Sequence, residues 1–215
     1  MNSSRYESLT GAVGLDFPEY EAPPPQPLGL VQRWLAEAVD HGVREPRAMA
    51  LATADALGRA SHRMVHATEL SDRGVVFTTH STSQKSREMD ATGWASGLLY
   101  WRETSQQVVL SGPVARLGEA ETDALWAARP VPLHAMTHLS HQSEPLPDAE
   151  ALRAAARRLE AAGTPLPRPS RFVGYLLAPD VVEFWSAGPD RLHRRLRYDR
   201  QAGSAAGWRP VRLQP

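Results

Sequence analysis

The chain has 215 residues, enough for one domain or, less often, two small ones. A hydrophobic content of 42% and a charged content of 22% are typical of a globular protein with a buried core. The 24 basic and 24 acidic residues cancel, so the composition gives no sign of a nucleic-acid-binding protein. The absence of cysteine excludes disulfides, thiolate metal sites and a cysteine nucleophile.

No targeting or membrane segment is visible in the sequence. Residues 1–20 lack both a positively charged start and an apolar stretch, so they do not resemble a signal peptide. No apolar run reaches the ~20 residues that a membrane-crossing helix needs. We therefore expect a cytoplasmic protein that binds neither nucleic acid nor membranes.

The first part of the chain predicts an arm, a helix and three strands. Residues 1–27 are polar and proline-rich, and proline fixes φ and removes a backbone donor, so they predict an arm that is disordered or crosses a partner subunit. The remainder, 28–215, is predicted to be a single domain. Apolar residues on one face predict a helix over 28–39. Short β-type runs separated by turn sequences then predict an antiparallel three-stranded meander, at 48–53, 61–68 and 74–79.

The rest of the chain continues this mixture of strands and short helices. Helices are predicted over 83–91, 119–128 and 148–162, and residues 129–146 are expected to form a loop. Further strands are predicted at 94–101, 106–117, 171–177, 181–186, 191–199 and 208–213. This series of short strands, with short helices between them, favours a mainly β (α+β) antiparallel barrel with peripheral helices. A Rossmann dinucleotide site is not expected, since the sequence has no strand–GxGxxG–helix unit.

A single lysine stands out among the basic residues. Of the 24 Lys and Arg residues, all but Lys85 are arginine. Lys85 follows a strand and a hydroxyl-rich turn, in the first turn of the predicted helix 83–91. Free N–H groups at a helix N-terminus favour an anion, so this segment is a candidate phosphate site. The alternative is an ordinary helix cap with a lysine there by chance.

Arginine also falls within a predicted strand. Alternation places Arg63 and Val65 on one face of the strand 61–68, and Met64, His66 and Thr68 on the other. An unpaired buried arginine is costly, so Arg63 either binds a phosphate or carboxylate, or faces water on an edge strand.

Near the C-terminus, basic residues recur with a period of two. Arg191, His193, Arg195 and Arg197 share one face if this segment is extended. Either neighbouring acids such as Asp190 and Asp199 neutralise them, or they form an oxyanion pocket. Trp185, at the end of the preceding strand, could belong to the core or stack on a planar ligand.

Three histidines have spacings that a metal site could use. His134, His138 and His141 are separated by four and three residues, but no HExxH motif or fourth ligand lies nearby. We therefore expect no metal site.

Several ordered motifs together resemble the pyridoxamine/pyridoxine 5′-phosphate oxidase family of FMN-binding split barrels. They lie at 63–65, 76–85, 107–109, 128–130, 141–143, 183–185, 191–195 and 208–215. Segments 8–11, 15–20 and 101–107 are similar to the branch of this family that serves phenazine biosynthesis. The resemblance implies a dimeric split β-barrel, a homodimer with one FMN per chain at its interface.

The resemblance also assigns residues, and it explains Lys85 and Arg63 with one ligand. The cofactor-binding residues that it implies are Arg63, Met64, Val65, His66, Thr78, Thr79, Gln84, Lys85, Gln107, Gln142, Ser143, Trp185 and Arg195, some of them from the second subunit. The substrate-binding residues that it implies are Thr68, Arg129, Arg191 and His193. Arg191 and His193 are also the candidate catalytic residues, and no obligatory general base is assigned.

One departure bears on the substrate. Where pyridoxine phosphate oxidases carry a lysine that binds the substrate phosphate, this chain has Thr68, and Leu125 and Leu133 replace a tyrosine and a serine. The resemblance therefore implies a wider, more apolar pocket, suited to a reduced phenazine carboxylate that would be oxidised through FMN with dioxygen as acceptor. The alternatives are a pyridoxine phosphate oxidase with an unusual pocket and a non-catalytic flavin-binding protein. The retained Arg191 and His193 favour an enzyme.

Overall fold

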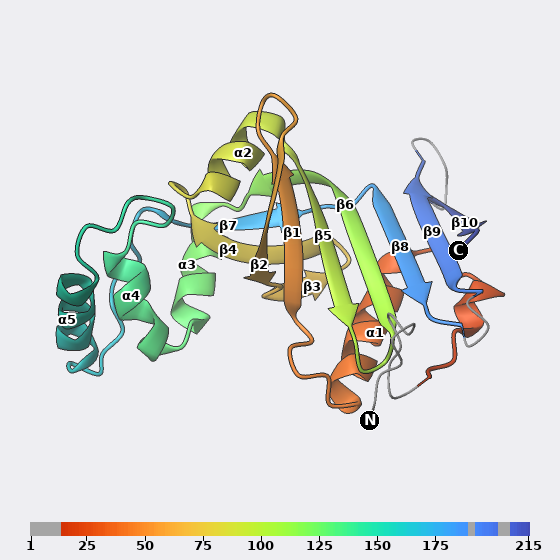
Figure 1. The fold of residues 1–215 in the computed structure, drawn as a ribbon, viewed down its shortest axis with the longest axis horizontal. Helices are drawn as coiled ribbons and strands as arrows, with labels where there is room; N and C mark the ends of the chain where they lie inside the picture. Colours follow the sequence, from red (N-terminus) through yellow and green to blue (C-terminus); the bar gives the residue numbers. More distant parts are fainter. Residues whose placement is uncertain (1–13, 189–191, 202–206) are drawn as a thin grey trace, which may run out of the picture.

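The computed structural model describes residues 14–188, 192–201 and 207–215 (Figure 1). Within them, ten strands form one antiparallel sheet. The strands are β1 (Ala48–Ala54), β2 (Ala60–His66), β3 (Glu69–Ser71), β4 (Gly74–His80), β5 (Trp94–Trp101), β6 (Gln106–Arg116), β7 (Phe172–Leu177), β8 (Val181–Ser186), β9 (Arg194–Arg200) and β10 (Trp208–Leu213). The helices are η1 (Pro18–Tyr20), α1 (Pro27–Asp40), α2 (Gln84–Thr92), α3 (Glu119–Ala128), η2 (Val131–Leu133), α4 (His134–Leu139) and α5 (Ala149–Glu160).

The sheet divides at the long strand β6. The main path runs β10-β9-β8-β6-β5-β1-β2, while a branch runs from β6 through β7 to β4 and β3. The first half of β6 pairs with β8 and its end, from Val114, pairs with β7, so one strand serves both parts. This curled antiparallel arrangement with helices around it confirms the predicted split β-barrel.

The predicted three-stranded meander is wrong. β1 and β2 do pair antiparallel, but β2 ends the main path and β4 pairs with β3 and β7. β4 is buried along nearly its whole length, so it needs partners inside the fold. Gly74 permits this approach, since a Cβ there would lie 2.1 Å from the Leu177 carbonyl oxygen and its φ is +132°.

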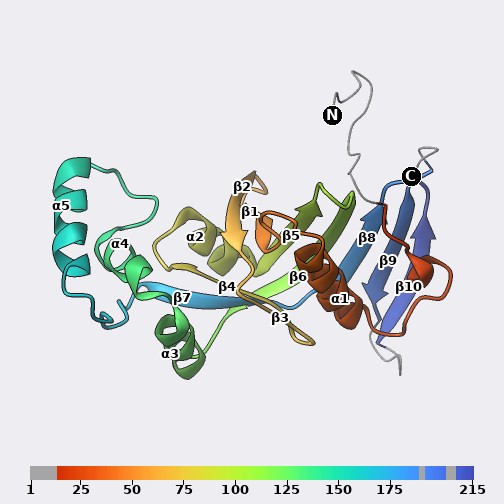
Figure 2. The ribbon, with the colours of Figure 1, turned by 90° about the horizontal axis from the view of Figure 1, so that it is seen from below.

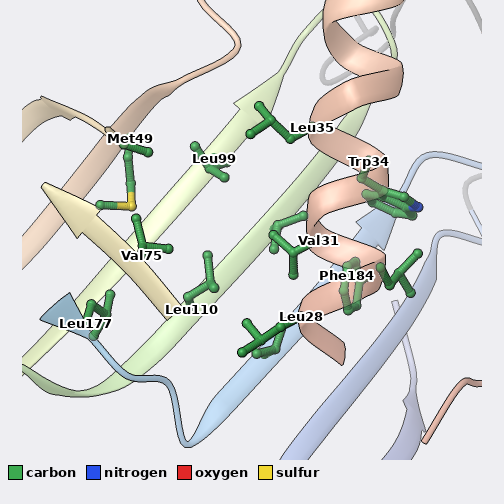
Figure 3. Packing of buried hydrophobic residues seen from close by; sticks show 14 of the residues in the cluster. Leu28, Val31, Trp34, Leu35, Met49, Val75, Leu99, Leu110, Leu177 and Phe184 are labelled. Carbon is green, nitrogen blue, oxygen red and sulfur yellow. The ribbon is translucent and has the colours of Figure 1, made fainter. Parts of the chain in front are cut away.

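The main core lies between α1 and the concave sheet. Leu28, Val31, Trp34 and Leu35 on one face of α1 pack against sheet residues that include Phe184 (Figure 3). The Trp34 and Phe184 rings meet edge to face with centroids 5.1 Å apart. Burying each of these side chains contributes about 1.5–3 kcal/mol, so this helix holds the sheet in its curved form.

The described end of the predicted arm packs on its own domain. Phe17 is 2% exposed and its ring lies 4.8 Å from that of Trp34. Glu19 pairs with Arg33, and the Arg212 guanidinium lies over the Tyr20 ring. Residues 14–26 therefore cover one end of the core, while the division of the chain at residue 27 stays a prediction.

Two local predictions need correction. The predicted loop 129–146 contains η2 and α4, which tertiary contacts stabilise: His134 is 2% exposed and its ring stacks on Trp126 at 4.2 Å. The last basic strand begins at Arg194 instead of Arg191, and residue 191 lies outside the described residues.

The peripheral helices lie toward one end of the molecule. Figures 1 and 2 show α4 and α5 beyond the end of β7, opposite the strands β8, β9 and β10. Figure 2 also shows α1 lying across one side of the sheet. Among the described helices, none has the length and apolar character needed to cross a membrane.

Candidate functional site

A polar cavity of about 420 Å³ lies among β2, the end of β4, the start of α2 and residues 142–143. Every predicted cofactor-binding residue lines it except Gln107, Trp185 and Arg195. The lining residues are Ser61, His62, Arg63, Met64, Val65, His66, Thr78, Thr79, Gln84, Lys85, Gln142 and Ser143. The structure thus brings together three segments that are far apart in the sequence.

Local sequence places Lys85 at this cavity. The strand β4 ends at His80, and Ser83 caps α2 by accepting a hydrogen bond from the Ser86 N–H. This cap starts the helix so that Lys85 lies in its first turn, where it is 7% exposed. The prediction of a strand, a hydroxyl-rich turn and a capped helix is confirmed.

Lys85 is a buried cation among neutral acceptors. Its Nζ donates to Gln142 Oε1 at 2.8 Å and to Thr79 Oγ1 at 3.2 Å. Burial, followed by the positive charge of Arg63, lowers the pKa of Lys85 to about 8, although Glu88 opposes the shift. A desolvated ammonium beside a guanidinium is stabilised by an incoming anion, so this corner of the cavity suits a phosphate.

Arg63 lies on the edge strand β2 but does not face water. Its guanidinium donates to the hydroxyls of Thr53 and Ser61, and its Nη2 lies 3.4 Å from Glu88 Oε2. The side chain of Arg63 is 19% exposed. The prediction of a phosphate or carboxylate partner is confirmed, with the Glu88 carboxylate as that partner, whereas the prediction that Arg63 faces water is wrong although the strand is an edge.

Residues 142 and 143 close the cavity from a distant part of the sequence. The Gln84 backbone N–H donates to Ser143 Oγ at 3.1 Å, which satisfies a free donor at the start of α2. The Gln142 N–H donates to His80 Nδ1 at 3.4 Å. Burial and then the charge of Arg171 lower the pKa of His80 to about 4, so this ring stays neutral and can accept.

Glu88, with Thr53, is a site residue that sequence reasoning missed. Burial by itself would raise the pKa of Glu88, but hydrogen bonds from Ser61, Thr53, Gln84 and Arg63 together lower it to about 2. The available signal was helical spacing, since a residue four positions after Gln84 lies on the same face of α2. Its pairing with Arg63, however, joins residues 25 apart, and no local pattern reports that.

The other three predicted cofactor-binding residues form a row across the sheet. Gln107 on β6 is paired with Trp185 on β8, which is paired with Arg195 on β9. Opposed residues in antiparallel strands project to the same face, so these three side chains share one surface. They do not line the cavity within this chain.

Acidic residues neutralise Arg195 and its neighbour on β9, Arg197. The Arg195 guanidinium lies 2.7 Å from Glu183, and that of Arg197 lies 2.6 Å from Asp199. Of the two hypotheses for this segment, neutralisation is confirmed for Asp199, with Glu183 as a further partner. Asp190 lies outside the described residues.

His193 lies beside this row, although it precedes the strand. Its ring centroid is 4.8 Å from that of Trp185, and its Nδ1 accepts from the Gly188 N–H at 3.2 Å. This bond assigns the proton of a neutral ring to Nε2, which leaves Nε2–H as a donor. Arg191, the other candidate catalytic residue, is outside the described residues.

Arg129 and Thr68 lie outside the lining of the cavity. Arg129 is half-buried, its Nη2 donates to Thr137 Oγ1 at 3.3 Å, and its buried Nε has no partner among the described residues. Burial lowers the pKa of Arg129. The Thr68 N–H donates to the Val76 carbonyl at 2.8 Å. Leu125 packs with Trp126 in a separate apolar cluster and not in the cavity.

Two protein-family profiles match this chain. Residues 35–163 match the profile described as pyridoxamine 5′-phosphate oxidase, and residues 172–215 match the pyridoxine 5′-phosphate oxidase C-terminal dimerisation region. The chain belongs to the pyridoxamine 5′-phosphate oxidase family. The row on β6, β8 and β9 thus lies largely within the dimerisation region of this family.

Individual members of the pyridoxamine 5′-phosphate oxidase family are similar over most of the chain. A dihydrophenazinedicarboxylate synthase from Burkholderia lata is 57% identical over 215 residues and covers 100% of both chains. A pyridoxine/pyridoxamine 5′-phosphate oxidase from Paraburkholderia phymatum is 42% identical and covers 89% of this chain and 90% of its own. The crystal structure of PhzG from Burkholderia lata with tetrahydrophenazine-1-carboxylic acid has a TM-score of 0.91 at 56% identity, covering 95% of this chain and 100% of that one.

Proposed function

We propose that this protein is an FMN-dependent oxidase of phenazine biosynthesis that oxidises reduced phenazine carboxylates. The observation that carries the proposal is the 57% identity over the whole chain to a dihydrophenazinedicarboxylate synthase. The relative bound to tetrahydrophenazine-1-carboxylic acid supports the same substrate class. When bound, FMN supplies the two-electron acceptor for the oxidation, with dioxygen as the proposed final acceptor.

The cavity fits the phosphate end of FMN. Lys85 and Arg63 provide two positive charges, and Glu88 balances one of them. Donors that can bind phosphate oxygens surround them, from Thr79, Gln84 and Ser143. We assign the phosphate to this corner and the ribityl chain to the adjoining part of β2.

A second copy of the chain completes the site in this proposal. Gln107, Trp185 and Arg195 project from one face of the sheet and do not reach the cavity of their own chain. In a two-fold homodimer each such row can lie against the cavity of the partner. Trp185 would then cover a planar ring, and Arg195 and Gln107 would donate to its polar edge.

Arg129, Arg191 and His193 are assigned to the substrate carboxylate. The buried Arg129 Nε, which has no partner among the described residues, is a donor that an anionic ligand would satisfy. His193 offers Nε2–H as a donor or as a proton carrier, since its Nδ1 is already occupied by Gly188. We assign to these residues the binding and orientation of the substrate and help in moving a proton.

The principal competing function is pyridoxine 5′-phosphate oxidation, which the 42% identical relative supports. Thr68 argues against it, because a neutral hydroxyl stands where a pyridoxine phosphate oxidase would use a lysine. Losing one charged partner of a bound phosphate costs about 2–5 kcal/mol, a factor of roughly 30 or more.

The test compares both substrates on one preparation at equal flavin occupancy. We expect a dihydro- or tetrahydrophenazine carboxylate to be oxidised readily, and pyridoxine 5′-phosphate to be oxidised at a kcat/KM at least ~30-fold lower. A higher kcat/KM for pyridoxine 5′-phosphate would make this a vitamin B6 enzyme. A yellow protein that oxidises neither would be a flavin-binding protein without oxidase activity.

A further inference from the structure

Two hydroxyls connect Arg63 to Glu88, one from Ser61 in the cavity lining and one from Thr53 outside it. Thr53 and Ser61 are directly opposed in the β1–β2 ladder. Arg63 Nη1 donates to Thr53 Oγ1, and Arg63 Nη2 donates to Ser61 Oγ at 2.6 Å. Both hydroxyls in turn donate to Glu88 Oε2, with Ser61 at 2.6 Å. A hydroxyl has one proton, so each can serve the carboxylate while accepting from the guanidinium.

These contacts fix the orientation of Arg63. Both Nη groups are committed, and Nη1 also donates to the Leu51 carbonyl at 3.3 Å. The Nε–H of Arg63 is left without a partner among the described residues. A planar guanidinium held along one edge presents its remaining donor in a fixed direction.

Glu88 also holds a second cavity residue. Its other oxygen, Oε1, accepts from Gln84 Nε2 at 2.8 Å. Thr53 and Glu88 are 3% and 7% exposed, and neither lines the cavity. Any influence of these two residues on a ligand in the cavity must therefore pass through the lining residues that they contact, Ser61, Arg63 and Gln84, or through the charge of Glu88.

We propose that Glu88 is a positioning residue of the phosphate site, which fixes Arg63 through the hydroxyls of Thr53 and Ser61 and holds Gln84 directly. The inference rests on the proposed binding of FMN at this cavity. The rival view is that Glu88 only ties α2 to the β1–β2 hairpin, which Figure 1 shows beside it. The two differ in whether the network acts on the phosphate group or on the protein as a whole.

The comparison of FMN with riboflavin separates these views, because riboflavin has no phosphate. We expect Thr53→Val, which removes one hydroxyl without changing charge or shape, to weaken FMN binding roughly tenfold and to leave riboflavin binding unchanged. Thr53→Ser retains the hydroxyl and should restore the wild-type ratio of the two affinities. Fluorescence titration of both flavins gives each Kd.

Thr122→Val is the matched control. Thr122 is also 3% exposed, and its hydroxyl donates to the Gly118 carbonyl on α3, away from the cavity. It should leave the FMN-to-riboflavin ratio unchanged. Equal weakening of both flavins by Thr53→Val, or no change in either, would overturn the positioning role.

Two further measurements apply if Thr53→Val does not fold or if FMN does not bind at the cavity through its phosphate. Thr53→Ala, which also lacks the hydroxyl and lies outside the cavity lining, replaces Thr53→Val if that variant does not fold, and the same fall in the ratio is expected. A wild-type protein that binds FMN no better than riboflavin would refute the phosphate assignment itself. In that case protection against thermal unfolding by inorganic phosphate, measured for wild type and Thr53→Val, decides whether the network positions an anion site; equal protection of both would refute it.

Discussion

Two basic regions of this protein differ in how far their positive charges are paired with acidic residues. At the cavity, Arg63 pairs with the Glu88 carboxylate while Lys85 contacts only neutral acceptors, so one positive charge has no acidic partner among the described residues. On the sheet face of β9, Arg195 and Arg197 each pair with an acid of their own. The unpaired positive charge at the cavity would be neutralised by an anion. The charges on the sheet face are already paired, so that face is suited to contact a second subunit.

Removing Lys85 should have the largest effect. Lys85→Ala takes away a charge-assisted contact to phosphate worth about 1.5–3 kcal/mol, so FMN affinity should fall roughly 10- to 150-fold. Arg197→Ala, the control from the neutralised face, should change FMN affinity less than about threefold because that charge is already paired. Equilibrium titration with FMN measures the affinity of both variants. Similar losses of affinity in the two variants would show that the two regions do not differ in this way.

Mixing two defective variants tests whether the regions meet across a dimer. Lys85→Ala damages the cavity and Trp185→Ala damages the row, so a heterodimer of the two contains one intact composite site. After exchange of subunits in an equal mixture, about half of the dimers are heterodimers, and about a quarter of the wild-type sites should be recovered. Flavin binding and oxidase activity of the mixture are compared with those of each variant. If no activity returns although heterodimers are detected by mass spectrometry, both regions act within one chain.

The smallest predicted effect is on the pH dependence of FMN binding. The pKa of Lys85 in the flavin-free protein is about 8, below its usual 10.5, because of burial and Arg63. Binding a phosphate dianion favours the protonated amine, so affinity should be fully present about one unit below pH 8 and lost as pH rises through 8, by about fivefold between pH 8 and 9. Below about pH 6 protonation of the phosphate itself weakens binding. The dependence above pH 8 should be absent from Lys85→Ala and from riboflavin binding, and its persistence in that variant would assign it to another group.

Much of the secondary structure and one half of the site could be predicted from local patterns. Apolar residues on one face located α1, and the sequence around Lys85 placed a helix N-terminus directly after a strand. Alternation put Arg63 and Met64 on opposite faces of β2, as their half-buried and exposed side chains confirm. These features depend on contacts between near neighbours, which the order of residues specifies directly.

Other features depended on residues far apart in the chain. The predicted meander made β2 the partner of β4, whereas β4 pairs with β3 and β7. The pairing with β7 depends on the close approach of Gly74 to Leu177, which no local pattern reports. The short helix α4 forms where His134 packs on Trp126, and short helices gain most of their stability from such packing.

The sequence by itself determined that Lys85 lies at the start of a helix after a strand and that Arg63 lies within a strand, which made both candidates for binding an anion, since residue type and local periodicity set their charge and direction. Only the tertiary structure decided how they are held. It set Glu88 against Arg63 through Thr53 and Ser61, and it brought Gln142 to Lys85 across 57 residues. The physical reason is that hydrogen bonds and charge pairing act over a few ångströms in space, whatever the separation along the chain.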